Sequence, residues 1–278
     1  MDLTSPSTTR TSRTWRRFIR IRDSRGLLTV ILVGAFLWSL TSIQWGESLI
    51  HAGGTDAMRR IATAAITPDL SMDIIGAGIV ASWRTLAYAT AGVSLAVLLA
   101  IPLGVLASGV LARGTAAKLA SIGSFRGLLA FLRAIHELVW AWLILAAIGL
   151  TPMTAVLALA LPYAGILGRI FADMLNNVPD EPLRALRSSG ASEWQVLLYG
   201  RVPYTLASMV SYAMYRYECG IRSAAIMSFV GLGGLGYQIQ ISLEDLNYQE
   251  VWTFVYFLVA LVVVFELASG VIRRKLVT

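Results

Sequence analysis

The chain has 278 residues, a formal net charge of +7, 56% hydrophobic and 14% charged residues, and a mean hydropathy of +0.68. This composition excludes an ordinary soluble domain of the same size, and the apolar residues form runs of about twenty, the length of a bilayer-crossing helix. Seven arginines precede Leu27 and other basic residues gather at the ends of apolar runs. That is the positive-inside pattern of an all-α polytopic membrane protein, and it argues against nucleic-acid binding.

The N-terminal part is predicted to hold one membrane span and one external segment. Residues 1–26 form a basic tail, which the positive-inside rule places in the cytoplasm. The first transmembrane helix follows at 27–45, with Trp38 and Trp45 toward its far end, where indole rings suit the interface. Residues 46–80 then form a periplasmic segment with a possible interfacial helix.

Residues 81–278 are predicted to form a transmembrane domain with five further spans. The second span of the chain is interrupted by Pro102 and Gly104, which in membrane helices mark a kink packed by neighbouring helices. A total of six spans places both termini in the cytoplasm, so we expect a multi-pass protein of the bacterial inner membrane. The expected bounds of the five spans are about 83–111, 127–150, 154–171, 204–230 and 251–270.

A polar stretch at 181–203 separates the fourth and fifth spans and predicts a pair of short amphipathic helices. Asp180 is a suitable N-cap for the first helix, and Gly190 can end it in a left-handed conformation. Ser192 and Gln195 have the spacing of a capping box at the start of the second. The hairpin is predicted to lie in the cytoplasm.

No site for catalysis, metal or nucleotide is indicated. Gly231, Gly233 and Gly236 match G-x-G-x-x-G, but they follow a membrane span where a dinucleotide fingerprint follows a strand, so we expect them to end the fifth helix. Neither Lys118 nor Lys275 lies in a Walker A loop. Neither metal-ligand spacing nor a Ser-His-Asp arrangement is found. The chain is predicted not to be an enzyme, and any ATP must be bound by another chain.

Two pairs of opposite charges fall inside predicted spans. Arg133 and Glu137 are four positions apart in the third span, as are Glu218 and Arg222 in the fifth, so each pair can form an intrahelical ion pair. One interpretation is that these pairs neutralise themselves and hold helices together. The other is that basic residues in the spans line a path for an anion.

Arg216 favours the path interpretation because no acidic residue lies three or four positions from it. It is six positions from Arg222, or 240° at helical spacing, so the two side chains cannot share one face of the helix. At most one of them is expected to point straight into a path, and the other is expected to pack against a neighbouring span. The candidate path residues are Arg133, Arg216, Arg222, Tyr212 and Tyr215.

The hairpin resembles the EAA loop of importer-type ABC permeases, in which E-A-A, three residues and Gly are followed about a dozen residues later by Pro. In RALRSSGA at 184–191, Ala185, Gly190 and Ala191 are in register, as is Pro203 further on, whereas Arg184 occupies the Glu position and Leu186 that of the second Ala. The resemblance implies coupling helices that contact an ATPase subunit. The residues implied in coupling are Glu181, Leu183, Arg184, Ala185, Leu186, Arg187, Gly190, Ala191 and Pro203.

A closer resemblance covers roughly residues 80–278. The segments RAIHELVWAWLILAAIGLTP at 133–152, YRYECGIRSAAIMSFVGLGGLG at 215–236 and LLYGRVP at 197–203 are similar to phosphonate ABC transporter permeases of the PhnE type. This resemblance implies the type I ABC importer architecture, a homodimer, two ATPase subunits that bind ATP and Mg, and a periplasmic or lipid-anchored binding protein. The implied cargo is phosphonate or a related phosphorus oxyanion, phosphite or phosphate.

Two other classes remain open. A permease of the same architecture could carry another small solute, such as an amino acid, with less need of unpaired arginines in its path. A non-ATP membrane protein, such as a secondary carrier, would have no use for the hairpin at 181–203.

Overall fold

The structure is a computed structural model that describes residues 15–42, 53–112 and 114–277, and every regular element in these ranges is a helix. The first fourteen residues of the predicted tail, Trp45 and the start of the predicted external segment lie outside them. The chain divides into two compact units, Met1–Met58 and Arg59–Thr278. Each is described by itself.

The first unit contains helix α1 (Trp15–Thr41). Its part from Gly26 to Thr41 is an apolar helix. Large apolar side chains point outward on all sides, from Leu27 through Leu32 to Trp38. A helix that is apolar all round is buried in lipid or in protein, and the first span at 27–45 stays a prediction. Helix α2 (Gly54–Ala64) crosses the boundary between the units.

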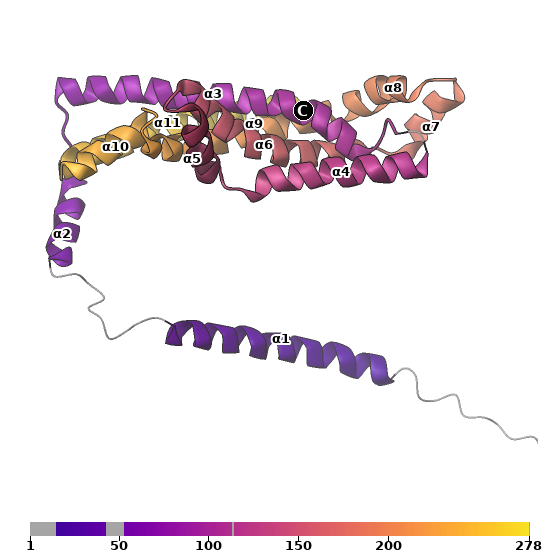
Figure 1. Cartoon of the computed structure of the whole chain (residues 1–278), viewed down its shortest axis with the longest axis horizontal. Coiled ribbons are helices and arrows are strands. Elements are labelled where there is room, and N and C mark those ends of the chain that lie inside the picture. Colours follow the sequence, from indigo (N-terminus) through magenta and orange to yellow (C-terminus); the bar gives the residue numbers. More distant parts are fainter. Residues whose placement is uncertain (1–14, 43–52, 113, 278) are drawn as a thin grey trace, which may run out of the picture. The chain divides into compact units, whose positions relative to one another are not determined.

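The second unit holds the remaining helices. Figure 1 shows α3 running along the bundle, with α10 toward one end and the short α7 and α8 toward the other. The order is α3 (Met72–Ser108), α4 (Thr115–Ala134), α5 (Glu137–Ile148), α6 (Pro152–Asn176), α7 (Asp180–Ser188), α8 (Glu193–Gln195), the π-helical turn η1 (Val196–Arg201), α9 (Val202–Met227), the 3-10 turn η2 (Ser228–Val230), α10 (Leu235–Glu244) and α11 (Tyr248–Val277).

Three of the described helices, α3, α6 and α11, are long and apolar enough to cross a membrane. Two bent pairs, α4 with α5 and the segment from Glu193 to Val230 with α10, bring the number to as many as five if each pair is one span. The predicted polytopic helical fold is therefore confirmed at this level. The prediction of six spans additionally counts the apolar helix in the first unit.

The predicted continuous span at 127–150 is wrong. α4 begins at Thr115 and ends at Ala134, and α5 begins at Glu137 with a bend of 89° between the two helix axes. Side chains satisfy the backbone groups that the break releases. His136 Nδ1 accepts a hydrogen bond from the Leu138 N–H (3.3 Å), and Trp140 Nε1 donates to the Leu132 carbonyl (3.2 Å).

The second span is longer than predicted. α3 begins at Met72, about eleven residues before the expected start, because the stretch before Trp83 is apolar apart from Ser82 and Asp73. Asp73 lies in the first turn, where the helix dipole favours an acidic side chain. The helix continues through Pro102 to Ser108. The interruption predicted at Pro102 is therefore absent.

Small residues set the packing of α3, α4 and α6. A Cβ added at Gly104 would lie 3.0 Å from the Gly168 carbonyl oxygen, and one at Gly165 would lie 2.8 Å from the Leu129 carbonyl oxygen. Backbones approach this closely only where side chains are absent, as is common between membrane helices. The three helices therefore form one tightly packed body.

α9 ends at Met227 and continues as the 3-10 turn η2, which has Gly231 as its C-cap. Of the glycines predicted to end the fifth helix, Gly236 lies instead in the first turn of α10. Gly231 (φ 95°) and Gly234 (φ 108°) adopt left-handed backbone conformations. The next helix, α10, was not predicted, and it begins with two backbone N–H groups held by side-chain hydroxyls: Leu235 donates to Thr85 Oγ1 and Gly236 donates to Ser228 Oγ, both at 3.0 Å. These bonds fix irregular backbone against α3.

Candidate functional site

The first helix of the hairpin, α7, ends in a Schellman motif. Gly190 has φ 84°, its N–H bonds the Arg187 carbonyl (3.0 Å), and the Ala191 N–H bonds the Leu186 carbonyl (3.1 Å). This is the predicted left-handed glycine end of the helix. Asp180 lies inside the first turn and Pro179 takes the N-cap position, so the predicted Asp180 cap is wrong; the carboxylate instead faces the positive end of the helix dipole.

The second helix of the hairpin begins with the predicted capping box. Ser192 Oγ accepts from the Gln195 N–H (3.4 Å), and the Ser192 N–H donates to Gln195 Oε1 (2.8 Å). The two bonds satisfy donors at a helix start that would otherwise lack partners. The chain then passes through η1 directly into α9, so the hairpin is continuous with a long apolar helix.

A small core holds the two hairpin helices together. Leu183 and Val196 are fully buried and pack with Val178, while Leu186 and Ala191 are partly buried against them. Close contact depends on Gly200, where an added Cβ would lie 2.9 Å from both Leu183 and Leu186. The segment 178–203 is therefore one packed structure, which we call the coupling unit after the role that the resemblance implies for it.

Arg201 joins the coupling unit to α6. Its side chain is only 9% exposed, and its guanidinium donates a hydrogen bond to the Leu175 carbonyl in the last turn of α6. A positive side chain is favourable at the C-terminal end of a helix, where carbonyl groups lack helical partners. The contact connects the hairpin with the α3–α4–α6 body.

The outer surface of the coupling unit is charged and apolar. Arg187 forms a bidentate pair with Glu193 (3.0 and 3.1 Å), and this pairing raises the pKa of the guanidinium above its ordinary value. Trp194, Leu198 and Tyr199 are exposed beside it, Tyr199 by 73%. Of the residues implied in coupling, Leu183 is buried inside, Leu186 and Ala191 are half-buried, and the others are exposed, namely Glu181, Arg184, Ala185, Arg187, Gly190 and Pro203.

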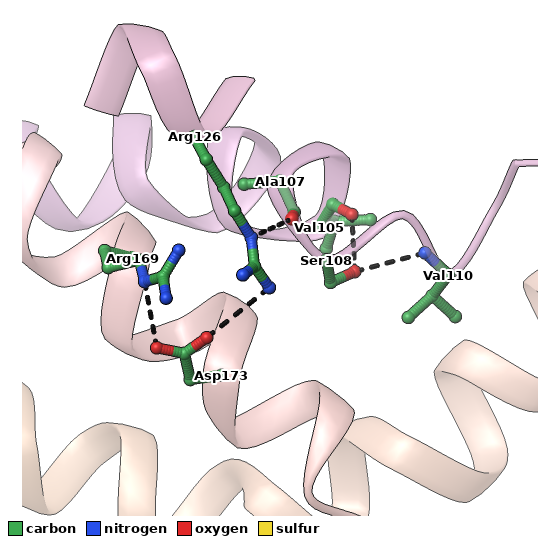
Figure 2. Close-up of polar contacts among 7 residues, drawn as sticks. All are labelled: Val105, Ala107, Ser108, Val110, Arg126, Arg169 and Asp173. Carbon is green, nitrogen blue, oxygen red and sulfur yellow. Dashed lines mark hydrogen bonds and ion pairs between the residues drawn. The ribbon is translucent and has the colours of Figure 1, made fainter. Parts of the chain in front are cut away.

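A cluster of charges joins the middle of α4 to the C-terminal ends of α3 and α6 (Figure 2). Asp173 accepts from Arg169 Nε (2.9 Å) and lies 3.5 Å from Arg126 Nη2. Arg126 Nε also donates to the Ala107 carbonyl in the last turn of α3 (3.2 Å). Asp173 thus pairs with Arg169 within α6 and with Arg126 across to α4. Figure 2 shows Ser108 beside this cluster. Its hydroxyl donates to the Val105 carbonyl and accepts from the Val110 N–H at the end of α3.

Arg216 lies among three tyrosines. Its Cζ is 5.4 Å from the ring centre of Tyr163 and 5.9 Å from those of Tyr212 and Tyr215, and Nη2 donates a long hydrogen bond to the Tyr212 hydroxyl (3.4 Å). Its Nε is buried without a hydrogen-bond partner. Among the described residues no carboxylate lies within ion-pair distance of Arg216. The structure thus brings Arg216, Tyr212 and Tyr215 together.

Arg222 lies apart from this cluster. Its Nη2 pairs with Glu218 Oε1 at 3.0 Å, as predicted for residues four positions apart, and its side chain is 53% exposed while that of Glu218 is 8% exposed. The two arginines of α9 therefore have different surroundings, in agreement with their 240° separation. Arg222 is compensated by a carboxylate, and Arg216 is not.

The predicted Arg133–Glu137 pair does not form. The helix break falls between the two residues, so their helical spacing is lost. Glu137 Oε1 instead accepts from Ser223 Oγ (2.7 Å), and Oε2 lies 3.7 Å from His136 Nε2. Arg133 is exposed in the last turn of α4, and among the described residues no carboxylate forms an ion pair with it.

Two residues of the cluster were missed by the sequence reasoning. Tyr163 of α6 contacts Arg216 through its ring, and its hydroxyl lies 3.0 Å from the Oγ of Ser223 on α9. Ser223 is seven positions after Arg216, a spacing that places both on one face of the helix. That spacing was the available signal for Ser223, whereas nothing in the local sequence singles out Tyr163.

The cluster has the chemistry to meet an anion. A guanidinium offers five N–H donors in a planar fork that matches an oxyanion. The contacts of the Arg216 guanidinium with described residues are cation–π contacts with tyrosine rings and one hydrogen bond to a tyrosine hydroxyl. Cation–π contacts contribute roughly 0.5–2 kcal/mol each, less than a charge-assisted pair in a low-dielectric site. An oxyanion could therefore bind without displacing a carboxylate.

A separate polar cavity of about 320 Å³ contains none of the predicted path residues. It is lined by the end of α2 and the segment after it, by the turn between α10 and α11, where Leu246 has a left-handed φ of 58°, and by the first turn of α11. The side chains and backbone that surround it are those of Arg60, Thr63, Ala64, Thr67, Asp69, Leu246, Asn247, Tyr248, Gln249 and Glu250.

Comparisons with known proteins cover most of the chain. The profile of the family described as binding-protein-dependent transport system inner membrane component matches residues 100–277. The chain is 33% identical over 239 residues to the phosphite transport system permease protein PtxC of Stutzerimonas stutzeri, covering 83% of both chains. It is 34% identical over 193 residues to the phosphate-import permease protein PhnE of Mycolicibacterium smegmatis, covering 69% of this chain and 36% of that protein.

Solved structures show a similar fold. A structure of the MetNI methionine ABC transporter in an inward-facing conformation contains a chain with a TM-score of 0.65 and 22% identity, covering 74% of this chain and 99% of that one. An amino acid ABC transporter matches with a TM-score of 0.57 and 17% identity. At these identities the likeness concerns the fold alone.

Proposed function

Because the chain belongs to the family of binding-protein-dependent transport system inner membrane components, we propose that it is the permease subunit of an importer for phosphonate, phosphite or phosphate. The solute crosses by alternating access, and its path is lined by the fifth span and the segments packed against it. The relatives named above as permeases for phosphite and phosphate support this class of cargo.

Arg216 is the observation that carries the proposal. A phosphorus oxyanion loses hydration in a low-dielectric passage, and fixed positive charge must offset that loss. Arg216 supplies a charge that no described carboxylate neutralises, together with unused N–H donors. Weak contacts suit a path, because tight binding would slow release. Selectivity is therefore assigned mainly to the binding protein.

The coupling unit suits an ATPase partner. Its exposed surface combines charged side chains with Trp194, Leu198 and Tyr199, and aromatic anchors with a polar surround are typical of protein interfaces. In this proposal two ATPase subunits bind ATP and Mg, the permease is a homodimer, and a periplasmic or lipid-anchored binding protein delivers the anion. ATP-driven closure of the ATPases moves the coupling unit.

The membrane arrangement completes the proposal. We count α1 as the first of six spans, which places both termini and the coupling unit in the cytoplasm of a bacterial inner-membrane protein. The coupling unit and the turn between α10 and α11 then lie on opposite sides of the membrane. That outer side is where the binding protein docks.

Reconstitution tests the cargo. The permease, its ATPase and its binding protein are placed in proteoliposomes, and ATP hydrolysis and uptake are measured with phosphite, methylphosphonate or phosphate. Methionine serves as the matched control solute. We expect stimulation by at least one phosphorus oxyanion and none by methionine. Stimulation by methionine alone would contradict the proposed phosphorus oxyanion cargo and favour an amino acid. Failure of the permease to co-purify with the ATPase would contradict its assignment as an importer subunit.

A further inference from the structure

A carboxylate and an arginine contact the same polar cluster between α5, α6 and α9. Glu137 Oε1 accepts from Ser223 Oγ (2.7 Å), which lies 3.0 Å from the Tyr163 hydroxyl, and the ring of Tyr163 lies 5.4 Å from Arg216 Cζ. We propose that Ser223 and Tyr163 hold Glu137 away from Arg216, so that the donors of the arginine stay available to the transported anion. This inference rests on the proposed function, in which Arg216 meets that anion.

The direction of the hydrogen bonds follows from the number of hydrogens. A serine hydroxyl has one hydrogen, and that of Ser223 is donated to the Glu137 carboxylate. The Tyr163 hydroxyl must therefore donate to Ser223 Oγ. The chain of bonds runs from Tyr163 through Ser223 to Glu137, and it directs both hydroxyl hydrogens toward the negative charge.

The same bonds determine where the carboxylate is held. Ser223 and Arg216 share a face of α9 but are seven positions apart, which corresponds to a rise of about 10 Å along the helix. The Ser223 Cα, next to which the carboxylate is bound, therefore lies about two helical turns from the Arg216 Cα. Tyr163 lies between the two charges, with its hydroxyl toward one and its ring against the other.

Without this restraint the two charges would attract each other. The Glu137 side chain is 18% exposed, and Arg216 is half-buried with an unpartnered Nε. Opposite charges in such surroundings are poorly screened. His136 Nε2 lies 3.7 Å from Glu137 Oε2, but its side chain is 62% exposed, so this contact holds the carboxylate weakly.

Glu137 is thus an internal competitor of the cargo. A carboxylate and a phosphorus oxyanion bind a guanidinium through the same donors. A Glu137 side chain paired with Arg216 would occupy the position of the anion and would remove the net positive charge of the path. Ser223 is accordingly a positioning residue, because it acts on the anion through Glu137.

The test is a rescue experiment in the reconstituted complex, with phosphite as cargo. Ser223→Ala is expected to lower uptake about tenfold, the usual scale of a lost hydrogen bond to a charged group. Glu137→Gln in the Ser223→Ala background is expected to restore uptake, because the competing charge is gone. Ser223→Thr, which keeps the hydroxyl, is the matched control and should transport close to wild type. Wild-type uptake by Ser223→Ala, or no rescue by Glu137→Gln, overturns the proposal.

A second readout does not depend on the cargo. Melting temperatures of the purified complex are measured in a double-mutant cycle of Glu137→Gln and Arg216→Gln, with and without Ser223→Ala. We expect no coupling between the two charges with Ser223 present, and a coupling of about 2–4 °C in the Ser223→Ala background. Equal coupling in both backgrounds overturns the proposal. If no phosphorus oxyanion is transported by the wild type, the proposed function fails, while this cycle still reports whether Ser223 separates the charges.

Discussion

The guanidinium of Arg201 donates a hydrogen bond to the backbone carbonyl of Leu175, and this contact joins the end of η1 to the last turn of α6. The two residues are 26 positions apart, and the whole of α7 lies between them. The bond therefore closes the coupling unit onto the helix from which it emerges. Movement of α7 relative to α6 must act against it.

We expect Arg201→Ala to destabilise the permease by about 1.5–3 kcal/mol, because it removes a buried hydrogen bond from a charged donor. ATP hydrolysis should persist while transport falls. Thermal melting and the ratio of ATP hydrolysed to solute transported measure the two effects. Arg201→Lys, which keeps the charge, should lie between Arg201→Ala and wild type. Wild-type melting and coupling in Arg201→Ala would show that the contact is dispensable.

Gly190→Val should uncouple ATP hydrolysis from transport. The backbone at this position has φ 84°, and a left-handed conformation costs a residue with a Cβ about 1–2 kcal/mol. No atom lies within 4 Å of an added Cβ, so the cost is conformational and not steric. Gly190→Asn is the control, since asparagine tolerates this region best after glycine. If valine and asparagine behave alike, the left-handed turn is not the cause.

Gly236→Ala should prevent correct packing of α10. An added Cβ would overlap the Ala225 carbonyl oxygen and lie 2.7 Å from Ser228 Oγ, so backbone must move. Overpacking of this kind typically costs about 1–3 kcal/mol. Gly123→Ala, in the interior of α4 with open space around it, is the matched control and should be neutral or stabilising. The yield of folded complex in detergent and its melting temperature measure the difference between Gly236→Ala and Gly123→Ala. Equal values for the two variants would show that α10 can shift to accommodate the added methyl group.

Arg216→Ala and Arg222→Ala should each reduce transport without loss of assembly with the ATPase. The effect of Arg216→Ala should be larger, because Arg222 already pairs with Glu218 at 3.0 Å while Arg216 has no described carboxylate partner. Uptake assays and co-purification separate the two properties. Arg216→Lys retains charge but not the planar fork and should recover part of the uptake. Loss of assembly in either Ala variant would favour a structural role.

Arg184→Glu should leave the fold intact and change the affinity for the ATPase. The Arg184 side chain is exposed on α7, where a surface substitution usually alters stability by less than about 0.5 kcal/mol. A glutamate at this position matches the EAA pattern that the native arginine departs from. Binding of the ATPase to the purified permease measures the change, with Ser188→Ala on the same helix as the control. An unchanged affinity would place Arg184 outside the contact.

Local chemistry predicted the coupling unit well. The left-handed Gly190 and the capping box of Ser192 with Gln195 depend on residues within a few positions of one another. The pairing of Glu218 with Arg222 was predictable for the same reason, because α9 is unbroken between them. Each of these features needs no information about distant parts of the chain. The family resemblance then gave the class of protein, and the comparisons confirm it.

Tertiary contacts account for what was missed. The break before Glu137 is stabilised in part by Trp140, whose indole bonds a carbonyl in the preceding helix across the bend. A periodicity argument takes the stretch at 127–150 as one helix in spite of the charged residues at its centre. Tyr163 of α6 and Ser223 of α9 are sixty positions apart in the sequence, and their hydroxyls are in contact. A pairing at that separation follows from how α6 and α9 pack, which neither helix specifies by its own pattern.

The end-to-end length of α6 gives the Arg201–Leu175 contact a mechanical meaning. The helix has 25 residues, hence a length of about 37 Å at about 1.5 Å per residue. The coupling unit is attached at one end, and the glycine contacts with α3 and α4 lie along the shaft. A tilt of about 10° about one end moves the other by about 6 Å. Because α6 packs tightly against α3 and α4, the three helices would have to turn together, and α6 would then carry a small rotation at the coupling unit to its opposite end as a displacement wider than a water molecule.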